Sequence, residues 1–223
     1  MKLIRWSGFA AVAAGTIFAG IQPIHPPDVL SSVTTTAWAM IMPVKTAMCL
    51  LFLLGITGLY ARQVEEAGWL GLAGYLILSL SWALQTAFIF TETFTLPVLA
   101  AGSPAFVESF LGIFNGSPGK MNIGALPGVY GLVGLLYMLG GLVFGIATFR
   151  AGILPRWAAG LLVVAAVLTP AAALLPHAIQ RYAAVPFGFA IAWLGYVLFS
   201  ERRENASELA PARSARPEPS NAA

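Results

Sequence analysis

The residues WAMIMPVKTAMCLLFLLGITGLY occupy positions Trp38 to Tyr60, and Lys45 is the one charged side chain among them. A helix needs about 20 mostly apolar residues to cross the roughly 30 Å hydrocarbon core of a lipid bilayer. This stretch is long enough and apolar enough to do so. It also begins with tryptophan and ends with tyrosine, the aromatic residues enriched at membrane interfaces. The stretch therefore predicts a transmembrane helix.

The chain as a whole has the composition of a membrane protein. Hydrophobic residues make up 58% of its 223 residues, and charged residues only 9%. A soluble domain carries about a quarter charged residues, and a soluble protein this apolar would expose patches that aggregate. We therefore expect the lipid bilayer as the main partner of the chain, and no nucleic acid. Six segments meet the length requirement or come close to it: residues 6–21, 38–60, 69–90, 129–149, 157–175 and 183–199.

These segments are continuous apolar runs rather than alternating ones, which disfavours a β-barrel and predicts an all-α membrane protein. We expect residues 1–203 to form a single six-transmembrane-helix bundle built as three helical hairpins. Trp6, Trp69 and Trp157 stand near the start of the first, third and fifth segments. A duplicated hairpin would explain this recurrence, although interfacial tryptophan also recurs in unrelated membrane proteins. Residues 204–223, rich in Ala, Pro, Ser and Glu, are predicted to be a disordered cytoplasmic tail.

The basic residues predict the orientation of the bundle. With both termini in the cytoplasm, only Lys45, Lys120 and Arg181 of the 12 Lys and Arg residues lie outside. This distribution follows the positive-inside rule, and the opposite orientation would invert it. Lys2 and Arg5 before an apolar run also resemble a secretory signal peptide, but no A-x-A cleavage site follows them. We expect the first segment to be retained, with its cleavage as the alternative.

The longest connection covers residues 91–127, which the orientation places outside. Within it, Ser103 can cap a helix that has Pro104 at its first position. Three phenylalanines then recur at every fourth residue up to Phe114. This pattern predicts a short amphipathic helix over about 104–114, which lies on the membrane or across the mouth of the bundle.

Small residues predict close helix packing. Ser7, Ala11, Gly15 and Ala19 recur at every fourth position and form one smooth face of the first helix. Small residues let the backbones of membrane helices approach closely, which is how such helices associate in lipid. The pattern predicts a compact bundle, and it leaves open a homo-oligomer or a complex with a membrane partner.

Seven polar residues of the sequence are expected to lie at similar depth, in one outer layer. At 1.5 Å of rise per residue, Gln85 lies about 24 Å and Glu92 about 34 Å above Trp69. Similar estimates place Lys45 and the two histidines at comparable depth. One interpretation of this layer is an outward-facing polar pocket. The alternative is that this depth is simply the outer interface, where polar residues are common. The candidate layer consists of Lys45, Gln85, Glu92, His25, His177, Asp28 and Arg181.

Lys45 is the residue on which the pocket hypothesis depends, because it lies inside an apolar run. It either extends along its own stem to the headgroups, or it pairs with Glu92. The sequence slightly favours the first interpretation.

No motif predicts catalysis, a metal or a cofactor. Two histidines and a carboxylate are a known ligand set, but His25 and His177 lack the local spacing of a metal motif. No serine stands in a nucleophile elbow. The single cysteine, Cys49, is expected to be a small buried residue. We therefore assign no catalytic residue, no metal ligand and no cofactor.

Residues LLGITGLYARQVEEAGWLGL, from Leu53 to Leu72, resemble a family of small polytopic bacterial plasma-membrane proteins, of about six helices, whose function is unassigned. The resemblance covers the first predicted cytoplasmic turn and the helix ends on either side of it. It implies a bacterial plasma (inner) membrane, and it implies no activity and no site residues.

Three classes of function agree with these observations. The class that we favour is a non-enzymatic membrane protein that binds a lipid or small apolar ligand, or serves as a partner subunit. The first alternative is a small-molecule or ion transporter that acts as an oligomer, although no pair of broken helices is evident. The second alternative is a membrane-embedded enzyme with an outward-facing polar site.

Overall fold

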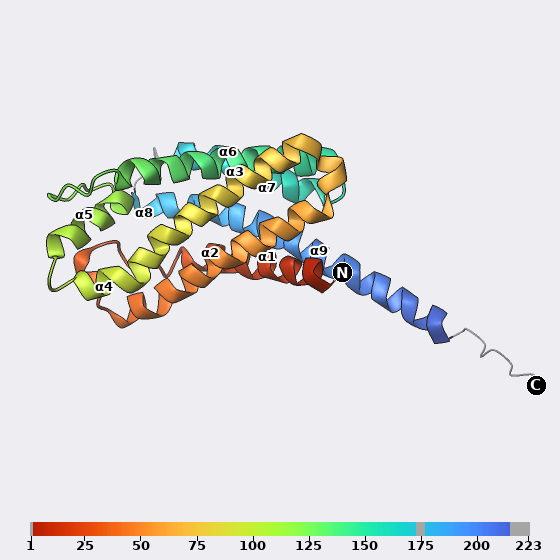
Figure 1. Ribbon diagram of the computed structural model, residues 1–223, viewed down its shortest axis with the longest axis horizontal. Coiled ribbons are helices and arrows are strands. Elements are labelled where there is room, and N and C mark those ends of the chain that lie inside the picture. The colour runs from red at the N-terminus through yellow and green to blue at the C-terminus, as the bar shows by residue number, and fades with distance from the viewer. Residues whose placement is uncertain (1, 173–176, 215–223) are drawn as a thin grey trace, which may run out of the picture.

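The computed structural model of the protein describes residues 2–172 and 177–214, and within them the side chains of residues 3–169, 171–172 and 179–200. The described chain is helical and contains no β-strand, as the continuous apolar runs predicted (Figure 1). The elements in chain order are α1 (Lys2–Ile21), η1 (Leu30–Ser32), α2 (Thr36–Arg62), α3 (Val64–Phe90), η2 (Thr91–Thr95), α4 (Leu96–Leu99), α5 (Pro104–Asn115), α6 (Leu126–Ala151), α7 (Arg156–Ala172), α8 (His177–Gln180), η3 (Arg181–Ala183) and α9 (Ala184–Ser214).

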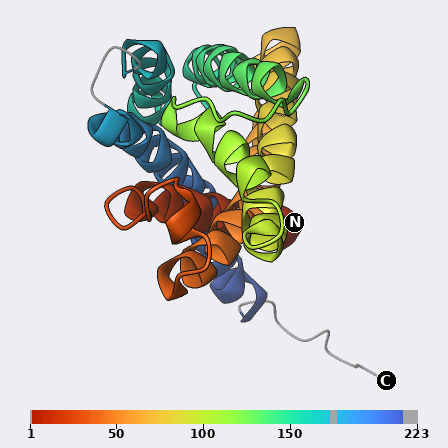
Figure 2. The ribbon, with the colours of Figure 1, turned by 90° about the vertical axis from the view of Figure 1, so that its left-hand side faces the viewer.

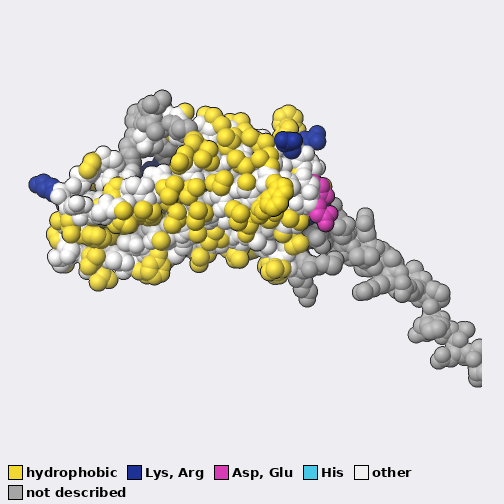
Figure 3. All heavy atoms as spheres, turned by 45° about the horizontal axis from the view of Figure 1, so that its top comes forward, with side chains coloured by type: hydrophobic (Ala, Val, Ile, Leu, Met, Phe, Trp, Pro, Cys, Tyr) yellow, Lys and Arg dark blue, Asp and Glu magenta, His cyan; other side chains and the backbone are white. Residues whose placement is uncertain are grey.

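Five helical stretches in the described chain are long and apolar enough to cross a membrane. α7 is apolar but shorter. Hydrophobic side chains cover the flank of the molecule in Figure 3, whereas the visible acidic and basic side chains gather at its two ends. This distribution is that of a helical membrane protein. The five stretches are Leu3–Ile21, Thr36–Arg62, Val64–Leu99, Leu126–Ala151 and Arg181–Ser200.

The long helices and α7 form a closed ring. Each helix packs on the next in the order α1, α2, α3, α6, α7 and α9, and α9 packs again on α1. One end of the ring carries the α2–α3 and α6–α7 turns, and we call it the Arg62 end. At the opposite end, the α5 end, α5 crosses the ring (Figure 2). The first and last helices of the ring are therefore direct neighbours.

Glycines allow the close contact between α1 and α9. A Cβ atom built on Gly8 would lie 2.9 Å from the carbonyl oxygen of Gly195, and one on Gly15 would overlap the backbone at Gly188. The smooth face of α1 also meets α2, where Ala11 packs against Gly55. Small residues thus join three helices within one chain, as small residues do in membrane bundles generally.

The third helix is longer than expected. The segment was predicted to end at residue 90, with a loop over 91–127, but the helical path continues through η2 and α4 to Leu99. The reason is that η2 is a π-helix, in which the N–H of Leu96 bonds to the carbonyl of Thr91 five residues earlier. The chain widens its turn here instead of leaving the helix, so the connection before α6 is shorter than predicted.

The short helix expected over about 104–114 is present as α5, which buries Val107, Phe110 and Leu111. Ser103 precedes it but makes no side-chain capping bond. Gly116 ends it in the left-handed conformation, with φ of 73°, which a glycine adopts without strain.

The predicted disordered tail covered residues 204–223. The α9 backbone is helical as far as Ser214, since Ala184–Ser214 forms one continuous helix. Residues 215–223 lie outside the described part of the chain.

Candidate functional site

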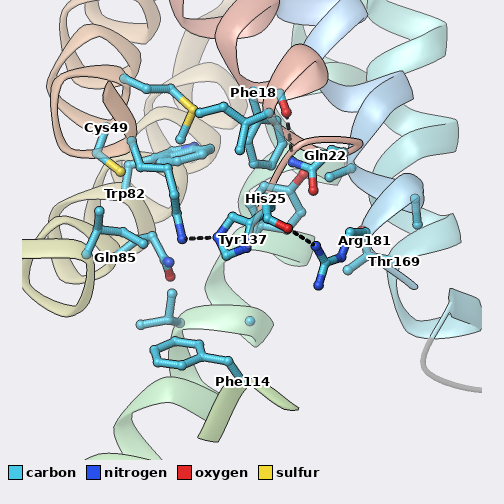
Figure 4. Close-up of a pocket in the computed structure, with 18 of the residues that line it drawn as sticks. Phe18, Gln22, His25, Cys49, Trp82, Gln85, Phe114, Tyr137, Thr169 and Arg181 are labelled. Atoms are coloured by element: carbon cyan, nitrogen blue, oxygen red, sulfur yellow. Dashed lines mark hydrogen bonds between the residues drawn. The ribbon is translucent and has the colours of Figure 1, made fainter. Parts of the chain in front are cut away.

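A cavity of about 430 Å³ lies inside the ring toward its α5 end. Side chains from α1, α2, α3, α6 and α7 line it together with the segments near the α5 end, so no single hairpin forms it. Phe114 of α5 also lines the cavity (Figure 4). Its volume lies within the range of about 300–1,000 Å³ that is usual for small-molecule sites.

The cavity brings together most of the polar layer predicted from the sequence. Six of the seven candidates line it, and they come from four separate parts of the chain. The side chain of the seventh, His177, lies outside the described residues. The six lining residues are His25, Asp28, Lys45, Gln85, Glu92 and Arg181.

Lys45 is the centre of the polar cluster. Its Nζ lies 2.9 Å from Oε2 of Glu92 and 2.8 Å from Nε2 of His25. The Glu92 side chain is only 1% exposed and that of Lys45 13% exposed, so this is a buried ion pair. The interpretation that Lys45 extends to the headgroups is wrong. The ammonium pairs within the bundle because a buried carboxylate offers it a partner, and an unpaired charge at this depth would be costly.

The bonds of His25 define its protonation state. Nδ1 lies 2.6 Å from the carbonyl oxygen of Pro26, to which it donates its proton. Nε2 therefore carries a lone pair and accepts a hydrogen bond from the Lys45 ammonium. Burial, and then the neighbouring Lys45 charge, lower the pKa of His25 to about 3, so the ring is neutral at pH 7. Figure 4 shows His25 with Gln85 on one side and Arg181 on the other.

The π-helix orients Glu92. In the π register the carbonyl of Glu92 would accept from residue 97, but Pro97 has no N–H. The indole Nε1 of Trp38 donates to this carbonyl instead, at 3.1 Å. One residue further, Thr93 Oγ1 lies within hydrogen-bond distance of two groups of α2, at 2.8 Å from Thr46 Oγ1 and 3.1 Å from the carbonyl oxygen of Met42. These bonds join η2 to α2, the helix that carries Lys45.

Aromatic rings form the floor of the cavity, toward the Arg62 end. Trp82 stacks on Phe52 at 3.8 Å between ring centroids, and Phe18 meets Trp82 edge-on at 5.4 Å. Tyr137 packs on Phe187 at 4.5 Å. The Nε1 atom of Trp82 is buried and has no hydrogen-bond partner among the described residues. This floor cannot be recognised in the sequence, because aromatic residues in apolar segments are also typical of an ordinary hydrophobic core.

Backbone contacts hold the α5 end of the cavity together. Arg181 Nη1 donates to the carbonyl of His25 at 3.1 Å, which joins the segment before α9 to the segment after α1. Asn115, at the end of α5, donates through Nδ2 to the carbonyl of Asp28 at 2.7 Å. The two bonds fix the residues that follow α1 between α5 and η3.

The described residues include no group of three or more His, Cys, Asp and Glu side chains placed to hold a metal ion. Ser81, a hydroxyl in the cavity wall, donates to the carbonyl of Val133 at 3.0 Å. The cavity combines an aromatic floor with a compact polar cluster, a combination that is common in small-molecule sites.

Comparison of the chain with protein families, with curated proteins and with solved structures returned no match.

Proposed function

We propose that the protein spans a bacterial plasma membrane six times, with both termini in the cytoplasm and the cavity facing outward. α7 supplies the sixth span, since its 17 residues extend for about 25 Å. The basic residues near the Arg62 end, among them Arg62, Arg150 and Arg156, support this orientation through the positive-inside rule. The resemblance around Leu53–Leu72 supports the bacterial membrane.

The proposed function is non-enzymatic binding of a small molecule that has an apolar body and a group accepting hydrogen bonds. The arrangement around Lys45 is the observation that carries this proposal. An ammonium has three donors, and Glu92 and His25 accept two of them. The third has no partner among the described residues and belongs to a group that lines the cavity. An acceptor on the ligand would complete it, while Trp82 and Tyr137 would contact the apolar body.

Native mass spectrometry of protein extracted in native lipid discs tests this function. A Thr169→Phe variant places a ring in the cavity, and among the described residues the Thr169 side chain bonds only to the carbonyl of Ala165 within its own helix. Val167→Phe is the matched control, because Val167 is 54% exposed on the same helix. We expect a small-molecule adduct on the wild type and on the control, and its loss from Thr169→Phe. A wild type without adduct, or one whose adduct survives Thr169→Phe, contradicts the proposal.

Transport is the second candidate, and the buried Lys45–Glu92 pair favours it. Ionisable groups within membrane helices are often part of ion or proton pathways. Proteoliposomes with an internal pH dye distinguish the two functions. A transporter of this kind moves protons across the membrane and loses that flux in Glu92→Gln. The binding function predicts no flux in either protein.

A further inference from the structure

Helix α5 forms part of the wall of the cavity at the α5 end of the ring. Its Phe114 lines the cavity, together with His25 and Asp28 from the segment after α1 and Arg181 from η3. Figure 2 shows α5 crossing the ring at this end. The wall at the α5 end therefore combines a helix that crosses the ring with two shorter segments beside it.

These parts of the wall are held by different kinds of contact. The segment after α1 is fixed through His25, whose ring accepts a hydrogen bond from Lys45 and whose carbonyl accepts one from η3. Over residues 104–121, the one side-chain hydrogen bond to the rest of the described chain comes from Asn115, which donates through Nδ2 to the carbonyl of Asp28 at 2.7 Å. α5 is therefore held mainly by apolar contacts.

The apolar face of α5 has two surfaces on which it can rest. Val107, Phe110 and Leu111 are buried against the ring, whereas Glu108 is exposed on the other side of the helix. An amphipathic helix of this kind also binds to a membrane surface through its apolar face. Val98 in the preceding helix α4 is 79% exposed, so apolar surface that faces the membrane lies close to the start of α5. α5 can thus exchange the ring for lipid without turning its apolar face to water.

α5 and the loop that follows it form one unit. A Cβ atom built on Gly112 would lie 2.5 Å from the carbonyl oxygen of Ser117, and one on Gly119 would lie 2.5 Å from the Cα atom of Ser109. The backbone N–H of Met121 donates to Oγ of Ser109 at 3.0 Å. Helix and loop are therefore packed backbone to backbone, and we expect them to move together.

The connections on both sides of this unit are exposed and contain glycine. Ala101 and Gly102 are exposed before it, and Asn122 and Gly124 are exposed after it. Gly124 has φ of 65°, in the left-handed region that glycine adopts without strain. Hinges are usually a few loop residues that absorb a change in backbone angles. Both connections have this character.

From these observations we propose that residues 104–121 form a lid over the cavity. The lid turns about residues 101–103 and 122–125, and the hydrogen bond from Asn115 to Asp28 latches it closed. In the open state the apolar face of α5 lies on the membrane, and the ligand enters from the α5 end. This inference rests on the proposed binding function and gives the ligand of that function its path of entry.

Labelling of Cys49 with N-ethylmaleimide tests the lid in the full-length protein in nanodiscs. Cys49 is the single cysteine of the chain, its side chain is buried, and it lines the cavity. The reagent reaches it when the cavity opens, and the mass of the protein then increases by one reagent. The same reaction in SDS gives the rate for the unprotected thiol. We expect slower labelling of the folded protein, at a rate proportional to the open fraction.

Two variants loosen the lid, and a third is the control. Leu111→Ala weakens its apolar contact with the ring, and Leu154→Ala is the matched control, because both leucines are 1% exposed and Leu154 lies in the α6–α7 turn at the Arg62 end. We expect Leu111→Ala to accelerate Cys49 labelling about tenfold or more, and Leu154→Ala to leave the rate unchanged. Asn115→Ala removes the latch and should accelerate labelling about two- to tenfold. Thermal unfolding shows whether each variant is folded at the labelling temperature.

Several outcomes overturn the lid. They are wild-type labelling as fast as in SDS, labelling that neither lid variant accelerates, and equal acceleration by the two leucine variants. Acceleration by Leu111→Ala but not by Asn115→Ala keeps the lid and overturns the latch.

The binding function is tested separately by the adduct in native mass spectrometry. Faster labelling of the lid variants without any adduct supports the lid and overturns the binding function. An adduct that Thr169→Phe removes, with labelling that the lid variants leave unchanged, supports the binding function and overturns the lid.

Discussion

Lys45 and Glu92 are separated by 47 residues along the chain, yet their charged groups lie 2.9 Å apart between two neighbouring membrane helices. Glu92 reaches this position from a π-helix, and Lys45 from the helix to which that π-helix is bonded. Widened helical turns of this kind occur frequently at functional sites, because they turn a side chain away from the regular α-helical register.

The first prediction concerns this pair. Lys45→Met or Glu92→Gln alone should destabilise the protein, by about 3–5 kcal/mol where a charge is left buried without its partner. The double variant should recover much of the loss. Thermal unfolding in detergent across the double-mutant cycle measures the coupling, and Lys120→Met, at an exposed lysine, is the control. Small and additive effects would show that the pair is not buried in the membrane-embedded protein.

A second prediction concerns pH. The pKa of His25 is lowered to about 3 in the folded protein, from about 6.5 in an unfolded chain. The unfolded state therefore binds more protons between these values, and stability falls as the pH is lowered from about 6.5 toward 3. The His25 contribution approaches about 1.4 kcal/mol per pH unit within that window. In His25→Gln, which keeps an acceptor for Lys45, the melting temperature should fall less steeply with decreasing pH. Identical slopes would refute the buried, neutral histidine.

The third prediction concerns the support of the π-helix. Trp38→Phe keeps a ring in place but removes the donor to the Glu92 carbonyl, so a buried carbonyl loses its partner. We expect a loss of about 1–3 kcal/mol in the free energy of unfolding. Trp69→Phe is the control, since Trp69 is 85% exposed. Equal stability of the two variants would mean that the indole bond does not hold η2.

A fourth prediction concerns the contact between α1 and α9. An added methyl group in Gly15→Ala would overlap the Gly188 backbone and lie 2.7 Å from the Ala192 nitrogen, so the two helices must move apart. We expect a destabilisation of about 1–3 kcal/mol. In Gly20→Ala, on the same helix, the added methyl group meets no atom of the described residues within 4 Å, so the change should be neutral or slightly stabilising. The difference in melting temperature between the two alanine variants tests the packing.

The last prediction concerns orientation. In a Cys49→Ser background, which removes the single cysteine, new cysteines at exposed Glu66 and exposed Lys120 report the two ends of the bundle. An impermeant maleimide applied to intact cells should label Lys120→Cys and spare Glu66→Cys. The reverse labelling pattern would show that the orientation is inverted and that the cavity faces the cytoplasm.

The helical fold was predictable because long apolar runs have few other stable arrangements. The run from Trp38 to Tyr60 needs no tertiary information to be assigned as a membrane helix. The depth of the polar layer was also predictable, since helix rise alone places Lys45 and Gln85 near one level.

The details of the site were harder to predict, because they depend on a local change of helical register. No pattern over residues 91–95 predicts a π-helix, so the sequence places Glu92 at the start of a loop. Pro97 was the signal to consider, since it leaves a preceding carbonyl without its helical partner. Lys45 either pairs with Glu92 or extends to the headgroups, and the position of Glu92 decides between these two arrangements. The sequence alone does not predict that position.

The closed ring has a consequence for how the protein is made. Helices enter a membrane in the order of synthesis and associate afterwards. α1 is synthesised well before α9, with which it makes its glycine-mediated backbone contact. Until α9 is made, this face of α1 lacks that neighbour, and the wall that Arg181 and α9 supply is missing. The cavity is therefore enclosed only once α9 is in place, so a chain interrupted before α9 carries Lys45 and Glu92 without an enclosed cavity around them.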